Sequence, residues 1–61
     1  MSENPGYEIR INAVPRTYRD VKAVAFDAAR FMKERYPRDL IEIVDLATGD
    51  KVLMLADGRT A

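Results

Sequence analysis

The chain has 61 residues, of which 10 are basic and 10 acidic, and it contains no cysteine, histidine or tryptophan. This composition excludes disulfides, zinc–thiolate centres and catalysis by histidine or cysteine, and no apolar run is long enough for a membrane span. Hydrophobic residues make up 48% of the chain, which is too apolar for a disordered protein. We therefore expect one small cytoplasmic domain with no cofactor, no metal and no membrane contact.

The chain opens with polar residues and then changes to a strand pattern. Residues 1–6 are expected to form a flexible N-terminal leader. From Tyr7 to Ala13, apolar and polar residues alternate, which is typical of a half-buried strand. Pro15 is expected to end this strand.

Residues 18–36 are predicted to form a helix. Thr17 followed by Asp20 fits the S/T-x-x-D/E pattern of a helix start, and Pro37 is expected to end the helix. Arg35 lies among the apolar positions near the end, where its stem can cover apolar surface. At 100° per residue the predicted core face contains Tyr18, Val21, Val24, Ala25, Ala28, Ala29, Phe31, Met32 and Tyr36.

Residues 40–46 and 51–56 are rich in Ile, Val and Leu and are predicted to form a β-hairpin. A three-residue loop, Ala47–Gly49, with its glycine in the left-handed conformation, places Val44 opposite Val52. This register assigns Ile41, Ile43, Leu53 and Leu55 to one face of the hairpin.

The predicted fold class is α+β: a two-layer β-α-β-β domain in which one helix packs on a three-stranded mixed sheet. The domain is expected to span residues 7–57, and residues 58–61 to form a C-terminal tail. The sequence leaves the strand order open. If the first two strands run parallel, the connection through the helix is right-handed.

In size and element order the chain resembles the 4-oxalocrotonate tautomerase family, whose small β-α-β subunits form oligomers. That family uses a proline that becomes the N-terminal residue after methionine removal. In this chain Ser2 follows Met1 and Pro5 is internal, so that no free proline amine is available. The resemblance therefore extends to size and element order and implies no activity.

The predicted hairpin register leaves its second face apolar, although one helix covers only one face of a sheet. An exposed apolar patch of a few hundred Å² marks an interaction surface, and small chains without disulfides or metals are often stabilised by self-association. We expect a homodimer, formed face to face or by edge-to-edge pairing of the sheets. A monomer in which a shifted register or the C-terminal tail covers the patch is the alternative. The predicted self-association residues are Leu40, Val44, Leu46, Val52 and Met54.

The helical region is basic, with seven basic and three acidic residues between Arg16 and Arg38, a local charge of +4. A phenylalanine among these cations suggests an anion-binding or partner-binding surface, where the ring stacks on a base or anchors a protein. The favoured alternative is a solvated helix face with an Asp27–Arg30 pair and the phenylalanine covered by a neighbouring segment. The neutral net charge argues against nucleic acid. The candidate binding residues are Arg19, Lys22, Phe26, Arg30 and Lys33.

No spacing of residues indicates catalysis. Asp20, Asp27 and Glu34 recur every seven residues along the helix, which is typical of a solvated stripe. We therefore expect a small non-enzymatic domain for homo-oligomerisation or protein interaction. The alternative is an anion-binding or nucleic-acid-binding module that uses the basic face of the helix.

Overall fold

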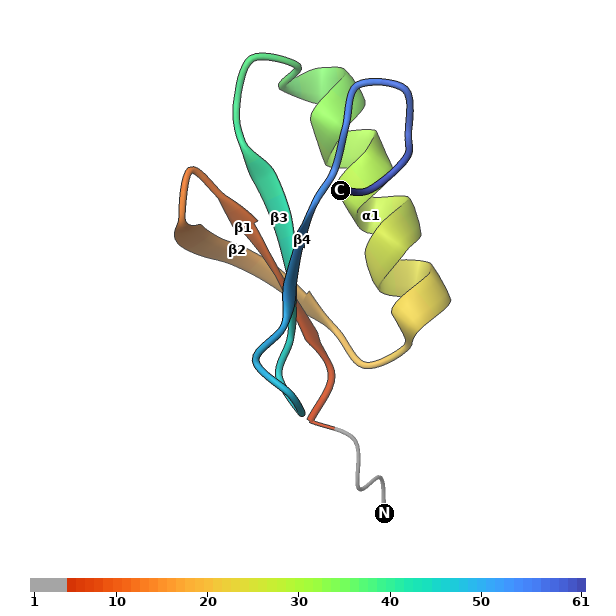
Figure 1. The fold of residues 1–61 in the computed structure, drawn as a ribbon. Helices are drawn as coiled ribbons and strands as arrows, with labels where there is room; N and C mark the ends of the chain where they lie inside the picture. The colour runs from red at the N-terminus through yellow and green to blue at the C-terminus, as the bar shows by residue number, and fades with distance from the viewer. Residues whose placement is uncertain (1–4) are drawn as a thin grey trace.

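The computed structural model describes residues 5–61 and contains one helix and four strands in that range (Figure 1). The α+β class is confirmed, but the sheet has four antiparallel strands in place of three mixed ones. Four of the six predicted leader residues lie outside the described range. In chain order the elements are β1 (Tyr7–Ile11), β2 (Val14–Arg19), α1 (Lys22–Arg35), β3 (Ile41–Asp45) and β4 (Lys51–Leu53).

The sheet has the order β2-β1-β3-β4, and every neighbouring pair is antiparallel. Strands β2 and β3 therefore run parallel to each other on either side of β1, and α1 connects them across one face of the sheet (Figure 1). The element order is β-β-α-β-β, so the predicted likeness in element order to the tautomerase family does not hold.

The first hairpin differs most from the prediction. Asn12 and Ala13 both have positive φ, 52° and 69°, as the central residues of a type I′ turn do, and this turn joins β1 to β2. The predicted strand end at Pro15 is wrong, because Pro15 lies within β2 opposite Arg10. The pairing shifts by one residue beside this proline, which is a β-bulge in β2.

Helix α1 begins later than predicted. Thr17 is paired with Ile9 in the sheet, and Val21 is the N-cap residue, without a side-chain capping hydrogen bond. The predicted start at Thr17 is therefore wrong. At the other end the Tyr36 N–H donates to the Met32 carbonyl, 2.8 Å away, and Pro37 follows as predicted.

The face of α1 that contacts the sheet is narrower than predicted. Ala25 and Ala29 are fully buried, and their small side chains let the helix approach the sheet closely. Phe26 is partly buried and packs against the core, which agrees with the favoured interpretation of a covered phenylalanine. Phe31 and Val24 were predicted to be core residues, but they are 63% and 47% exposed, on the side of α1 that faces the mostly exposed strand β2.

The β3–β4 hairpin is shifted by one residue from the predicted register. Ile43 lies opposite Val52, and the Asp45 N–H donates to the Asp50 carbonyl at 2.8 Å, so the loop has four residues, not three. Gly49 has the predicted positive φ of 82°. Because neighbouring strand residues point to opposite faces, this shift turns Val52 and Met54 toward α1.

Both ends of the described range are attached to the sheet. The Gly6 carbonyl accepts a hydrogen bond from the Leu46 N–H at 3.0 Å, and an added Cβ at Gly6 would overlap the Tyr18 phenol. In the predicted tail, Ala61 and Leu53 exchange two backbone hydrogen bonds of 2.9 and 3.0 Å. Residues 59–61 therefore lie along the outer edge of β4, and β2 forms the opposite edge of the sheet.

The core lies between α1 and one face of the sheet. Its largest fully buried side chains are Ile9, Ile41, Ile43 and Met54, which pack with the two helix alanines. Val44 is also buried, at 5% exposure, but it lies outside this cluster. Nearly all buried apolar surface is therefore concentrated in a single layer.

Candidate functional site

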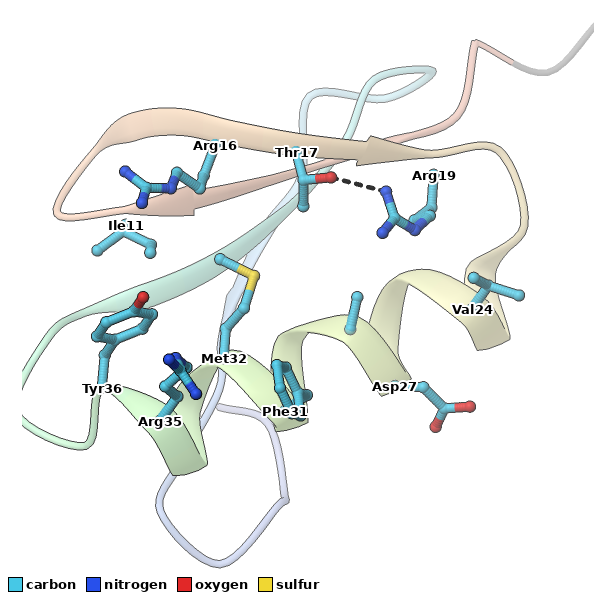
Figure 2. A pocket seen from close by; sticks show the side chains of 11 residues that line it. Ile11, Arg16, Thr17, Arg19, Val24, Asp27, Phe31, Met32, Arg35 and Tyr36 are labelled. Carbon is cyan, nitrogen blue, oxygen red and sulfur yellow. Dashed lines mark hydrogen bonds between the residues drawn. The ribbon is translucent and has the colours of Figure 1, made fainter.

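A groove of about 650 Å³ runs between β2 and α1 (Figure 2). Its origin is geometric, because the outer strands of a four-stranded sheet are roughly 14 Å apart, whereas a helix with its side chains is about 10 Å wide. Although α1 contacts β2 as well as β1 and β3, five of the six β2 residues remain exposed, so that α1 covers the inner side of β2 only in part. The groove is the uncovered part of the sheet surface.

The floor of the groove and most of the side chains on its α1 wall are apolar. Val24, Ala28, Phe31 and Met32 come from α1, and Ile11 comes from the end of β1. The four helix residues have the spacing of one helical face, which the sequence predicted to be core. In the structure this face is instead the lining of an open groove.

Three arginines line the same groove. Arg16 and Arg19 project from β2, and Arg35 extends from the last turn of α1 (Figure 2). The Arg19 guanidinium donates to the Thr17 hydroxyl and the Tyr18 carbonyl, both at 2.7 Å, which holds it beside the strand. These side chains give the groove two positively charged walls.

The acidic group among the residues that line the groove is Asp27. Its carboxylate is paired with the guanidinium of Arg30, one helical turn along α1. This Asp27–Arg30 pair was predicted as part of the solvated helix face. Because Arg30 already balances the charge of Asp27, the three arginines give the groove an excess of positive charge.

The predicted self-association residues do not form one exposed patch. Met54 is 1% exposed in the core, Val52 packs against that core, and Val44 is buried away from α1. Leu40 and Leu46 are 55% and 39% exposed. The one-residue shift of β4 separates these residues, because the predicted patch depended on Val52 and Met54 facing away from the helix.

The predicted basic surface is also divided. Arg19 belongs to β2 and to the groove. On α1, the Lys22 ammonium lies 5.7 Å from the centre of the Phe26 ring, and the Lys33 ammonium donates to the Asp39 carbonyl at 2.8 Å. Lys22, Phe26 and Lys33 therefore lie close to the sheet and its loops, outside the groove lining.

Arg30, the remaining member of the predicted basic set, forms the ion pair with Asp27 described above. Sequence reasoning therefore placed one groove residue, Arg19, among the candidate binding residues and did not include the groove residues Arg16, Val24 and Phe31. The position of Arg35 among the apolar residues of the helix was a signal that this helix face is not fully buried. A fully buried helix face rarely contains an arginine.

Outside the groove, the described part of the chain contains no metal-ligating cluster and no membrane-spanning helix. Within residues 5–61 no three carboxylates are grouped as a metal site, and the helix there is too short and too polar to cross a membrane. The pKa of the exposed Asp57 carboxyl is lowered by the Arg59 backbone N–H and then by the Arg59 side chain. These bonds close a surface turn at residues 57–59.

Comparison with protein-family models found no match for the chain, and comparisons with curated proteins and with solved structures found none either. Its function is therefore inferred from the groove.

Proposed function

We propose that the chain is a non-enzymatic protein-interaction domain that binds its partner in the groove between β2 and α1. The exposed side chain of Phe31 is the main observation behind this proposal. Of the seven large apolar side chains that are exposed in residues 5–61, two line the groove, Val24 and Phe31, and Phe31 is the most exposed of all seven.

The composition of the groove supports this assignment. Protein interfaces are enriched in aromatic residues and arginine, and their binding energy is concentrated in a few such anchors. Phe31 supplies an aromatic anchor, and Arg16 and Arg35 supply guanidinium groups on opposite walls. We also propose a cytoplasmic location, with which a chain that contains no cysteine is compatible.

A homodimer receives less support than a complex with a different protein. In a two-fold contact through the groove, the arginines of one copy would face those of the other. Edge-to-edge pairing is disfavoured because β2 contains Pro15 and a bulge, both of which disrupt strand addition. The edge of β4 is already paired with residues 59–61.

The anion-binding alternative also receives less support. Arg30 is paired with Asp27, and Lys33 is held by a backbone carbonyl. Phe26 packs against the core, which limits its use as a stacking platform for a base. Nucleic-acid binding through the predicted helix stripe would therefore require these local contacts to rearrange.

Photo-crosslinking in the cells that naturally make the protein tests the proposal. A benzoyl-phenylalanine replaces Phe31 in one variant and Leu46, which lies outside the groove, in a matched variant. We expect position 31 to give a discrete protein adduct and position 46 to give none. Equal labelling from the two positions, or no adduct from position 31, contradicts the proposal. An adduct of twice the chain mass identifies the partner as a second copy.

A further inference from the structure

We propose that the groove binds an amphipathic α-helix with acidic side chains, which lies beside α1 over β2 and completes the helical layer. This inference rests on the proposed function and specifies the chemistry of the partner. Three features of the groove support it: its shape, the spacing of its apolar side chains and its charge.

The shape of the groove favours a helix. Its lining on α1 extends from Val24 to Arg35, a span of about 17 Å at 1.5 Å per residue. Helices pack with axes 8–10 Å apart, so a second helix beside α1 would be centred close to β2. An extended peptide would instead have to pair with the edge of β2, where Pro15 and the bulge disrupt the hydrogen-bonding pattern.

The apolar side chains on α1 match helix-on-helix packing. Val24, Ala28 and Phe31 follow one another at intervals of four and three residues, which is the spacing of an apolar stripe that faces a neighbouring helix. The small Ala28 between two larger side chains leaves a recess for an apolar side chain of the partner. A partner helix that binds here needs apolar residues at i, i+3, i+4 and i+7.

The charge of the groove selects an acidic partner. Arg16 and Arg19 lie on the β2 side and Arg35 on the α1 side, while the Asp27 carboxylate is paired outside this set with Arg30. Carboxylates on both flanks of the partner's apolar stripe would meet these guanidinium groups, which form paired hydrogen bonds with carboxylates. Lysines at the same positions would be repelled.

Two synthetic helical peptides test this inference. Both have leucine at i, i+3, i+4 and i+7, and they differ only in having glutamate or lysine at the flanking positions. Binding to the ¹⁵N-labelled chain is followed by amide chemical shifts and by calorimetry at low and high salt. We expect the glutamate peptide to bind about tenfold or more tightly than the lysine peptide, with an affinity that falls as salt rises. The largest shifts are expected at Val24, Ala28, Phe31 and Met32.

Paired substitutions give the control. Arg16→Gln with Arg35→Gln removes two groove charges, and Arg38→Gln with Arg59→Gln removes two charges outside the groove lining. We expect the first pair to weaken binding of the glutamate peptide about tenfold and the second less than twofold. Thermal unfolding of each variant shows whether a loss of binding reflects a loss of folding.

Several outcomes overturn the inference, and they separate it from the proposed function. Equal binding of both peptides overturns the charge selection but leaves the groove as a docking surface. If neither peptide binds while Phe31 still crosslinks to a protein, the partner is not an acidic helix. If the chain forms a dimer and Phe31→Gln disrupts it, the occupant of the groove is a second copy of the chain. Single-stranded RNA that perturbs the three arginines but not Phe31 would identify nucleic acid instead.

Discussion

At the residue scale, the turn between β1 and β2 combines a favourable residue with a strained one. Asn12 and Ala13 both have positive φ, a conformation that asparagine tolerates better than alanine. The Asn12 side chain also accepts the Leu40 N–H at 3.0 Å and donates to the Asp39 carboxylate at 3.3 Å. Asn12 therefore ties the turn to the start of β3, whereas Ala13 contributes strain.

Replacement of the two turn residues by glycine is expected to have opposite effects. Ala13→Gly removes the strain and should raise the free energy of unfolding by about 0.5–1 kcal/mol, after the larger entropy of the unfolded glycine is subtracted. Asn12→Gly removes two hydrogen bonds and should lower it by about 1 kcal/mol. Urea unfolding of the two variants measures both changes. A loss of stability in Ala13→Gly would contradict the assigned turn.

At the element scale, the loop between β3 and β4 determines which residues of β4 enter the core. The Asp45 carboxylate accepts the Ala47 N–H at 2.9 Å, and the Thr48 hydroxyl accepts the Asp50 N–H at 3.1 Å. These local bonds stabilise a four-residue loop in place of the predicted three-residue one. One additional loop residue exchanges the two faces of β4, so that Met54 is buried in the core.

Alanine substitutions in and after β4 test this register. Met54→Ala should lower the free energy of unfolding by about 2–4 kcal/mol, because it leaves a cavity in the core. Leu53→Ala should cost about 1 kcal/mol, because Leu53 is only partly buried and lies outside the core cluster. Chemical denaturation of both variants gives the order of the two effects. The reverse order would support the register predicted from sequence.

At the scale of the whole molecule, one helix on a four-stranded sheet leaves little buried surface. At 0.05–0.15 kcal/mol per residue, a chain of 61 residues has an unfolding free energy of about 3–9 kcal/mol. Chains of this size bury only about 60% of the surface that they expose when unfolded, which favours the lower part of that range. A partner that binds the folded form therefore adds substantially to stability.

A substitution of Phe31 is expected to weaken binding without weakening the fold. Because its side chain is 63% exposed, Phe31→Gln should change the free energy of unfolding by less than about 0.5 kcal/mol. The glutamate peptide at 100 times its dissociation constant should stabilise the original chain by about 2.7 kcal/mol and the variant much less. Urea unfolding with and without peptide measures both effects. A loss of more than about 1 kcal/mol in the variant without peptide would place Phe31 in the core.

The candidate groove was only partly predictable. Arg19 was among the candidate binding residues and lines the groove, and Arg35 was recognised as unusual among the apolar helix positions. Val24 and Phe31 were assigned to the core because helical periodicity identifies an apolar face without showing how much of it a sheet covers. The width of the sheet relative to one helix leaves this part of the face exposed.

Local patterns were sufficient for the α+β class, the alternation in β1, the existence of α1 and the β3–β4 hairpin with its left-handed Gly49. Each of these follows from residues close together in the chain. Residues 14–19 were different. The Thr17–Asp20 pattern is typical of a helix start, but in the structure the backbone hydrogen-bonding groups of these residues are satisfied by pairing with β1 as a strand. The strand pairing, the β4 register and the exposed part of α1 depend on contacts between distant segments, whose burial energies outweigh local preferences.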